Sequence, residues 1–100
     1  MKVHGKALVL NNEYPSSLNN DPKNIEAANL FDAIHNRWFS DAVFQGDYPK
    51  IALEVLGKYL PSDFKEDLKI ISTPIDWLGL NYYTRSIIKN FQSNDGINYE

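Results

Sequence analysis

Apolar residues gather along the chain in short continuous runs and in longer segments with a helical repeat. The first run spans Ala7 to Leu10, and the second lies between Ile75 and Tyr83. Short runs of aliphatic and aromatic residues predict strands that are buried on both faces. We therefore expect one strand over residues 6–12 and another over residues 75–83, which residues 86–89 continue or extend.

The segment between these runs has the spacing of helices. Asp21 can accept hydrogen bonds from the free N–H groups of a helix that begins at Pro22, where the missing proline N–H costs nothing. Apolar residues then recur on one stripe at helical spacing as far as Gly46, which marks an end. Two further helices are expected, over residues 51–60 and over a short segment that ends near residue 70.

Polar stretches separate and follow these elements. Residues 11–21 are rich in Asn, Ser and Pro and predict a loop, and residues 92–100 predict a loose polar tail. The order of strand, loop, helices and strand predicts an α/β fold with two parallel strands and a right-handed crossover. Two parallel strands buried on both faces need neighbours, so we expect the chain to be part of a larger domain.

Composition and charge exclude several classes of function. The 100 residues carry 10 basic and 13 acidic side chains, a net charge of −3, whereas nucleic-acid binding favours a basic patch. Cysteine is absent, which excludes a disulfide framework, a thiolate metal site and a cysteine nucleophile. No apolar run approaches the roughly 20 residues of a membrane span, and the N-terminus lacks the apolar core of a signal peptide.

These exclusions limit the classes of partner that we expect this chain to bind. We expect a cytoplasmic protein without a nucleic-acid or membrane partner. The lone histidines His4 and His35 have no metal-ligand spacing, so neither a metal nor a cofactor is expected.

Polar side chains lie at the carboxyl ends of both predicted strands. Asn81 and Tyr83 share one face of the second strand, because side chains alternate, and Asn11 ends the first. Sites in α/β barrels and open sheets lie at this end of the strands. Amides and a phenol suit hydroxyl-rich ligands such as sugars. The same pattern also fits a tyrosine that packs its ring and leaves its hydroxyl in water.

Four motifs follow one another in order along the chain. They are Gly5-Lys6-Ala7-Leu8-Val9-Leu10-Asn11 with Tyr14-Pro15, then Asn36-Arg37-Trp38-Phe39, Gly46-Asp47-Tyr48-Pro49 and Trp77-Leu78-Gly79-Leu80-Asn81-Tyr82-Tyr83-Thr84-Arg85. In this order and spacing they resemble glycoside hydrolase family 1, the β-glucosidase and β-galactosidase family. The first motif resembles the fifth strand and the last resembles the sixth. The resemblance implies that residues 1–100 are part of a single (β/α)8 TIM barrel, which needs about 250 residues or more.

The resemblance also implies a retaining β-glycosidase that hydrolyses small β-glycosides or oligosaccharides with two carboxyl groups and no cofactor. The acid/base Glu of the family lies in a Thr-x-Asn-Glu-Pro motif and the nucleophile in Thr-Glu-Asn-Gly. Neither motif occurs here. Glu13 precedes Tyr14 and follows the wrong strand, and Glu100 lacks the nucleophile motif. We therefore expect no catalytic carboxylate in this chain and no activity of the chain alone.

The residues that remain are expected to support the missing carboxylates. By resemblance, Tyr83 donates a hydrogen bond to the nucleophile, which lowers the pKa of that carboxyl group. Asn81 lines the sugar site or holds Tyr83, Asn11 lines the aglycone side, and Tyr82 points outward toward the helices. Two alternatives stay open, a noncatalytic carbohydrate-binding or interaction module and a truncated inactive product. The presence of the two Glu motifs in flanking sequence would separate them from the enzyme.

Overall fold

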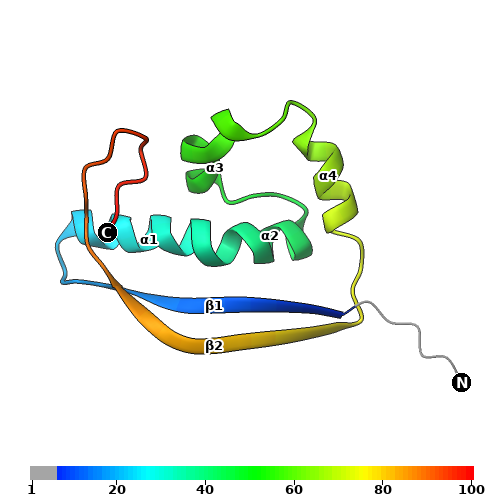
Figure 1. The fold of residues 1–100 in the computed structure, drawn as a ribbon, viewed down its shortest axis with the longest axis horizontal. Helices are drawn as coiled ribbons and strands as arrows, with labels where there is room; N and C mark the ends of the chain where they lie inside the picture. Colours follow the sequence, from blue (N-terminus) through cyan, green and yellow to red (C-terminus); the bar gives the residue numbers. More distant parts are fainter. Residues whose placement is uncertain (1–6) are drawn as a thin grey trace, which may run out of the picture.

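A computed structural model describes residues 7–100 as two parallel strands with helices on one side of them (Figure 1). Lys6 and Gly5, which belong to the first predicted strand and its motif, and His4 lie outside the described residues. The elements in chain order are β1 (Ala7–Ser17), α1 (Pro22–Asp32), η1 (Ala33–Arg37), α2 (Trp38–Gln45), α3 (Lys50–Leu56), η2 (Gly57–Tyr59), α4 (Phe64–Ile71) and β2 (Trp77–Ile88).

The long helical segment begins and ends where the sequence predicts. The Asp21 carboxylate accepts a hydrogen bond from Lys23 N at 2.9 Å, and Pro22 is the first helical residue. At the far end Gly46 adopts a left-handed conformation with φ 68°, which glycine tolerates best. The π-helical turn η1 in the middle, between α1 and α2, is a feature that the apolar stripe does not predict. Figure 1 shows α1 and α2 as one continuous rod above β1.

Both strands are longer than predicted. Residues 13–17, which the sequence assigns to a loop, continue β1, and residues 14–17 pair with the second half of β2. Of the predicted extension over residues 86–89, residues 86–88 are confirmed as part of β2, which ends at Ile88. Asn11 and Tyr83 therefore lie within their strands, and their expected place at the carboxyl ends is wrong. Residues 11–17 have the composition of a loop, but Asn, Pro and Ser are also tolerated next to a bulge in a strand. The prediction therefore ended the first strand too early.

The helices cover one face of the sheet. Leu8 and Leu10 of β1 face Trp38 and Ala42 of α2, and Leu10 is buried. The register partner of Leu10 in β2, Leu80, remains largely exposed, because the helices contact β1 more than β2. The face of β2 that carries Leu78 and Leu80 is therefore only partly covered.

The C-terminal segment folds back onto the start of the helical rod. The backbones of Lys89 and Glu100 exchange hydrogen bonds at 2.9 and 3.0 Å, and their side chains form an ion pair at 3.2 Å. Tyr99 packs against the buried cluster of Ala27, Ala28, Phe31 and Ile88. The segment over residues 92–100 thus differs from the loose tail expected from its polarity, because one aromatic side chain near its end finds an apolar site.

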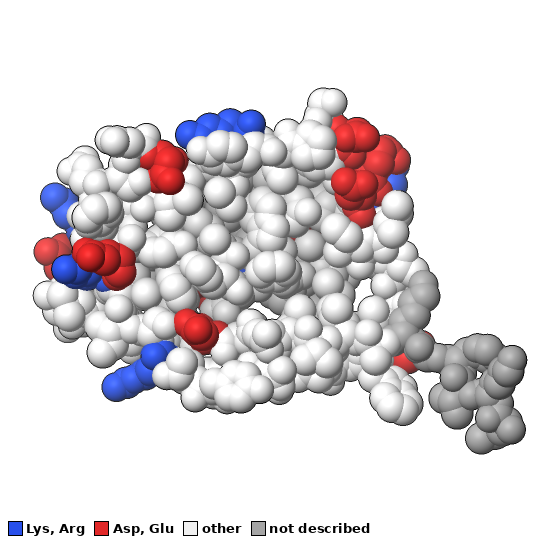
Figure 2. Space-filling view, in the orientation of Figure 1, with Lys and Arg blue, Asp and Glu red and all other residues white. Residues whose placement is uncertain are grey.

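Charged side chains are scattered at the margins of the face in Figure 2, and uncharged residues fill its centre. A group of acidic side chains lies over α4, where Glu66 and Asp67 occupy the first turn and are exposed. These carboxylates form a solvated face of the helix. Among residues 7–100, no helix combines the length and apolar character that a membrane crossing requires.

Candidate functional site

An amide pair joins the two strands at the predicted site. Asn11 and Asn81 are register partners in the parallel sheet. The Asn81 Nδ2 donates a hydrogen bond to Asn11 Oδ1 at 2.9 Å, across 70 residues of sequence. The structure therefore brings these two predicted side chains together, and each amide keeps further donors or acceptors for a ligand.

Tyr83 lies two residues beyond Asn81, and its side chain is 85% exposed. The neighbouring Tyr82 lines a hollow together with Asp32 and Arg37 of the helical layer, as expected for a residue that points outward. Because side chains alternate along a strand, Tyr83 follows Asn81 to the face that the helices leave open. Asn81 thus binds Asn11, and Tyr83 follows two residues further along the same strand.

The register of the sheet shifts beside Tyr83. Asn12 pairs with Tyr82 and Tyr14 pairs with Arg85, so β2 contains one extra residue at this point. Such a β-bulge redirects a side chain and raises the local twist, and bulges are common next to active sites. The sequence carries no clear signal for it.

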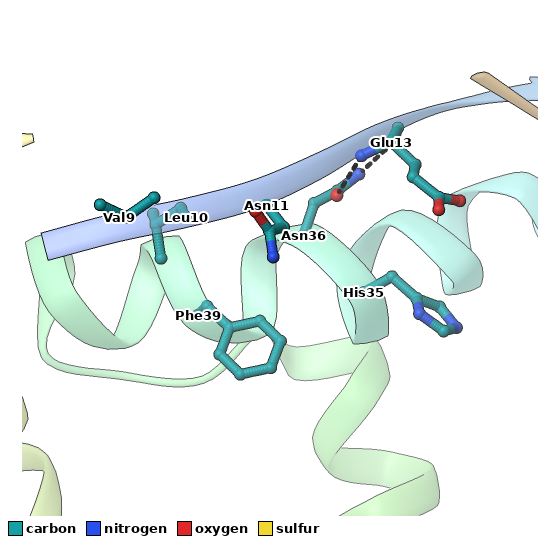
Figure 3. A pocket seen from close by; sticks show the side chains of 7 residues that line it. All are labelled: Val9, Leu10, Asn11, Glu13, His35, Asn36 and Phe39. Atoms are coloured by element: carbon teal, nitrogen blue, oxygen red, sulfur yellow. Dashed lines mark hydrogen bonds between the residues drawn. The ribbon is translucent and has the colours of Figure 1, made fainter. Parts of the chain in front are cut away.

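Glu13 lies opposite the bulge and is bound from two sides. The Asn36 side chain accepts from Glu13 N at 3.1 Å and donates to Glu13 O at 2.7 Å, as the dashed lines in Figure 3 show. The Glu13 carboxylate accepts a hydrogen bond from Ser86 Oγ at 2.6 Å. Sequence reasoning assigned Glu13 no part in the site and gave Asn36 no specific contact.

The turn η1 supplies Asn36 and is itself held by ion pairing. Asp32 accepts from Asn36 Nδ2 at 2.8 Å and from Arg37 Nε at 2.9 Å. One residue on, the ring of Trp38 stacks on Tyr48 with centroids 3.8 Å apart. These contacts give physical roles to the second and third sequence motifs, which tie the helical rod to the strand and to the segment before α3.

A hollow of about 410 Å³ lies beside β1 (Figure 3). Its walls come from the strand and from the helical rod, and Asn36 reaches across it to the strand. The lining residues are Val9, Leu10, Asn11, Glu13, His35, Asn36 and Phe39. Within residues 7–100 no three side chains are grouped as metal ligands would be.

Two groups in the C-terminal segment have shifted pKa values. A hydrogen bond from Ser93 and another from the backbone of Ile97 lower the pKa of Asp95. Burial raises the pKa of Tyr99, whose hydroxyl lies 2.8 Å from His35 Nε2. Both groups belong to the packing of the C-terminal segment and not to the Asn11–Asn81 region.

Known proteins match this chain over nearly all of its length. The model of glycosyl hydrolase family 1 matches residues 2–100. β-Glucosidase A of Acetivibrio thermocellus is 40% identical over 93 residues, which are 91% of this chain and 20% of that protein. The β-glucosidase of an Agrobacterium species is 43% identical over 77 residues, 77% of this chain and 17% of that protein.

Solved structures give the same result. A family 1 β-glucosidase from Thermotoga maritima matches with a TM-score of 0.84 and 32% identity, covering 98% of this chain and 22% of that chain. A structure of the T. maritima β-glucosidase in complex with glucoimidazole matches with a TM-score of 0.82 and 29% identity, covering 96% and 21%. The chain spans about a fifth of the length of these relatives, and its parallel strands and helices form part of a (β/α)8 barrel. This chain therefore belongs to glycosyl hydrolase family 1.

Proposed function

We propose that this chain is part of a β-glucosidase-like retaining glycoside hydrolase that acts on small β-glycosides or oligosaccharides. The observation that carries the proposal is the match to a β-glucosidase along 91% of the chain, together with the Asn11–Asn81 pair. The glucoimidazole complex of a structural neighbour supports a sugar as substrate. Amides on an open sheet face match the donors and acceptors of sugar hydroxyls.

The proposed reaction needs two carboxyl groups about 5 to 5.5 Å apart, one as acid/base and one as nucleophile. Neither family motif that carries them occurs among these 100 residues. Glu13 has a different task, because Ser86 binds its carboxylate. In this proposal both catalytic carboxylates come from parts of the barrel outside this chain, and the chain supplies the surface beside them.

Three residues have proposed supporting roles. Tyr83 donates its phenolic hydrogen bond to the ionised nucleophile, which favours the charged form and fixes its orientation. Asn81 lines the sugar site next to it, and Asn11 lines the aglycone side. The 85% exposure of the Tyr83 side chain supports this role, because its hydroxyl is accessible to a group from another strand.

The test uses a carrier enzyme, defined as the A. thermocellus β-glucosidase A in which these 100 residues replace the equivalent segment. We expect this carrier to hydrolyse p-nitrophenyl β-glucoside, and the isolated chain to show no turnover. The Asn81→Ala variant of the carrier should lose about tenfold in kcat/KM, because a hydrogen bond to the sugar is worth on the order of 1.4 kcal/mol.

The controls separate the alternatives. A carrier that is folded by circular dichroism but hydrolyses no β-glycoside contradicts the proposed function. Sugar binding without turnover in that carrier favours a noncatalytic binding module instead. Turnover by the isolated chain would show that a catalytic carboxylate pair lies within it.

A further inference from the structure

The bulge beside Tyr83 leaves Glu13 without a regular partner in β2. The flanking pairs, Asn12 with Tyr82 and Tyr14 with Arg85, are both intact, so Glu13 alone opposes Tyr83 and Thr84. A bulge that moved one residue toward the start of β2 would reverse the side on which Tyr83 lies, because side chains alternate with a period of two. The direction of Tyr83 therefore depends on what holds the bulge in place.

Asn36 replaces the missing strand partner. Its amide binds both the N–H and the C=O of Glu13, at 3.1 and 2.7 Å, as a neighbouring strand would. The amide cannot turn freely, since Asp32 also accepts from Asn36 Nδ2 at 2.8 Å. The π-helical turn η1 presents this side chain to the strand, and such turns are frequent at functional sites.

The Glu13 side chain holds the other end of the bulge. Its carboxylate accepts from Ser86 Oγ at 2.6 Å, and Ser86 lies three residues beyond Tyr83 in β2. Glu13 therefore connects the helical rod, through its backbone, with the part of β2 that follows the bulge, through its carboxylate. Tyr83 lies between this attachment and the Asn11–Asn81 hydrogen bond.

We propose that Glu13 and Asn36 are positioning residues that hold the bulge of β2 and thereby aim the Tyr83 hydroxyl at the catalytic nucleophile. This inference rests on the proposed function, because it needs the role given to Tyr83. It assigns Glu13 an indirect part in the reaction, through the backbone of β2 and without contact with the sugar.

The test is a set of double-mutant cycles in the carrier enzyme, with kcat, KM and the pH profile of kcat/KM as readouts. Ser86→Ala and Asn36→Ala should each lower kcat about fivefold, the equivalent of about 1 kcal/mol, leave KM within about twofold, and shift the acidic limb upward. In the Tyr83→Phe background neither should lower kcat further, since both act through Tyr83.

Variants of Glu13 provide a second measurement. Glu13→Ala should behave like Ser86→Ala, whereas Glu13→Gln should recover most of the lost rate, because its amide oxygen still accepts from Ser86. Glu66→Gln on α4 removes an exposed carboxylate of the Glu66–Lys69 pair and should leave every readout unchanged. If Glu13→Ala does not fold, the cycle with Ser86→Ala decides.

The outcomes distinguish this inference from the proposed function. If Ser86→Ala and Asn36→Ala lower kcat equally with and without the Tyr83 hydroxyl, Glu13 and Asn36 have only a structural role. That result overturns the inference and leaves the proposed function standing. An active carrier that is insensitive to Tyr83→Phe overturns the inference together with the role of Tyr83. A folded but inactive carrier overturns the proposed function, and the positioning role fails with it.

Discussion

At the scale of single residues, the open sheet face owes its chemistry to neutral hydrogen-bonding groups. Asn11 and Asn81 bind one another, and the phenol of Tyr83 extends beside them with its ring largely exposed. Neutral donors suit a task in which the protein must bind hydroxyl groups and orient a carboxylate without adding charge. The two adjacent tyrosines have different surroundings, because Tyr82 faces the helical layer and Tyr83 lies on the opposite face.

Loss of the Tyr83 hydroxyl should lower kcat and shift the pH profile of kcat/KM. In the carrier, Tyr83→Phe removes a hydrogen bond to a charged carboxylate, worth about 1.5 to 3 kcal/mol, and should lower kcat about ten- to hundredfold. The pKa of the nucleophile should rise, so the acidic limb of kcat/KM moves to higher pH. Steady-state kinetics over a pH series measures both effects.

Tyr82→Phe is the matched control for this prediction. It removes the same hydroxyl from the neighbouring residue on the helical side, and we expect the kinetics to change little. Equal effects of the two substitutions, or an unchanged acidic limb in Tyr83→Phe, would contradict the role given to Tyr83.

Part of the site could be predicted from residues and part could not. Asn11 and Asn81 were expected at the same rim of two parallel strands, and their hydrogen bond confirms that the two side chains meet. The contact of Asn36 with Glu13 was missed because its partners are backbone groups, which every residue has and which leave no mark in a sequence. The bulge was missed for a related reason, since neither Tyr83 nor Thr84 has an unusual backbone preference.

At the scale of elements, specific residues set the two ends of the helical rod. The rod begins at Asp21 and Pro22 and ends at Gly46. The ring of Trp38 stacks on Tyr48 and so holds the segment after Gly46 against the rod. These boundaries follow local rules and were predictable. The turn η1 divides the rod and carries Asn36, which binds Glu13 of β1, and the apolar stripe of the helix alone does not reveal this contact.

Gly46 should be sensitive to a single added methyl group. Its φ of 68° is unfavourable for alanine, and a Cβ there would meet Ser72 Oγ at 3.3 Å. Gly46→Ala should therefore destabilise the carrier by about 1 kcal/mol or more. Gly57→Ala is the control, because nothing lies within 4 Å of its Cβ position and its φ of −55° is helical. Urea denaturation compares them, and equal midpoints would refute the prediction.

The C-terminal segment should respond to alkaline pH through Tyr99. Burial raises the pKa of this phenol above its ordinary value of 10.0, so the folded segment favours the neutral form. Its contribution to stability is complete below that ordinary value and falls as the pH rises through the folded pKa. An ultraviolet titration of the carrier should show one tyrosine that ionises at higher pH than an ordinary phenol, and Tyr99→Phe should remove this late component. A late component that survives this substitution would contradict the assignment.

At the scale of the whole molecule, the chain is thin and extended. Its radius of gyration is 15.7 Å, whereas a compact domain of this length has about 13 Å. The extents of 55 × 34 × 16 Å correspond to one sheet and one helical layer. Large apolar side chains such as Val9 and Trp77 are exposed, and the main buried cluster includes two alanines. The need for neighbouring strands, expected from the two buried-type runs, is consistent with this shape.

The isolated chain should therefore be both inactive and weakly folded. We expect no hydrolysis of p-nitrophenyl β-glucoside above background, and an unfolding transition in urea that is broad and of low midpoint, because little apolar area is buried. Circular dichroism and the glucoside assay measure these on one sample. A sharp transition at high urea would contradict the inference that this surface requires the rest of a barrel.

The wide separation of the paired strands has a consequence for how the segment forms. Asn11 and Asn81 meet across 70 residues, so the sheet closes a long loop, whereas every helix between the strands forms from local contacts. During synthesis at about 5 to 20 residues per second, β1 leaves the ribosome about 4 to 14 seconds before its partner. In that interval the helical rod forms next to β1 and can cover Leu8 and Leu10 before β2 arrives.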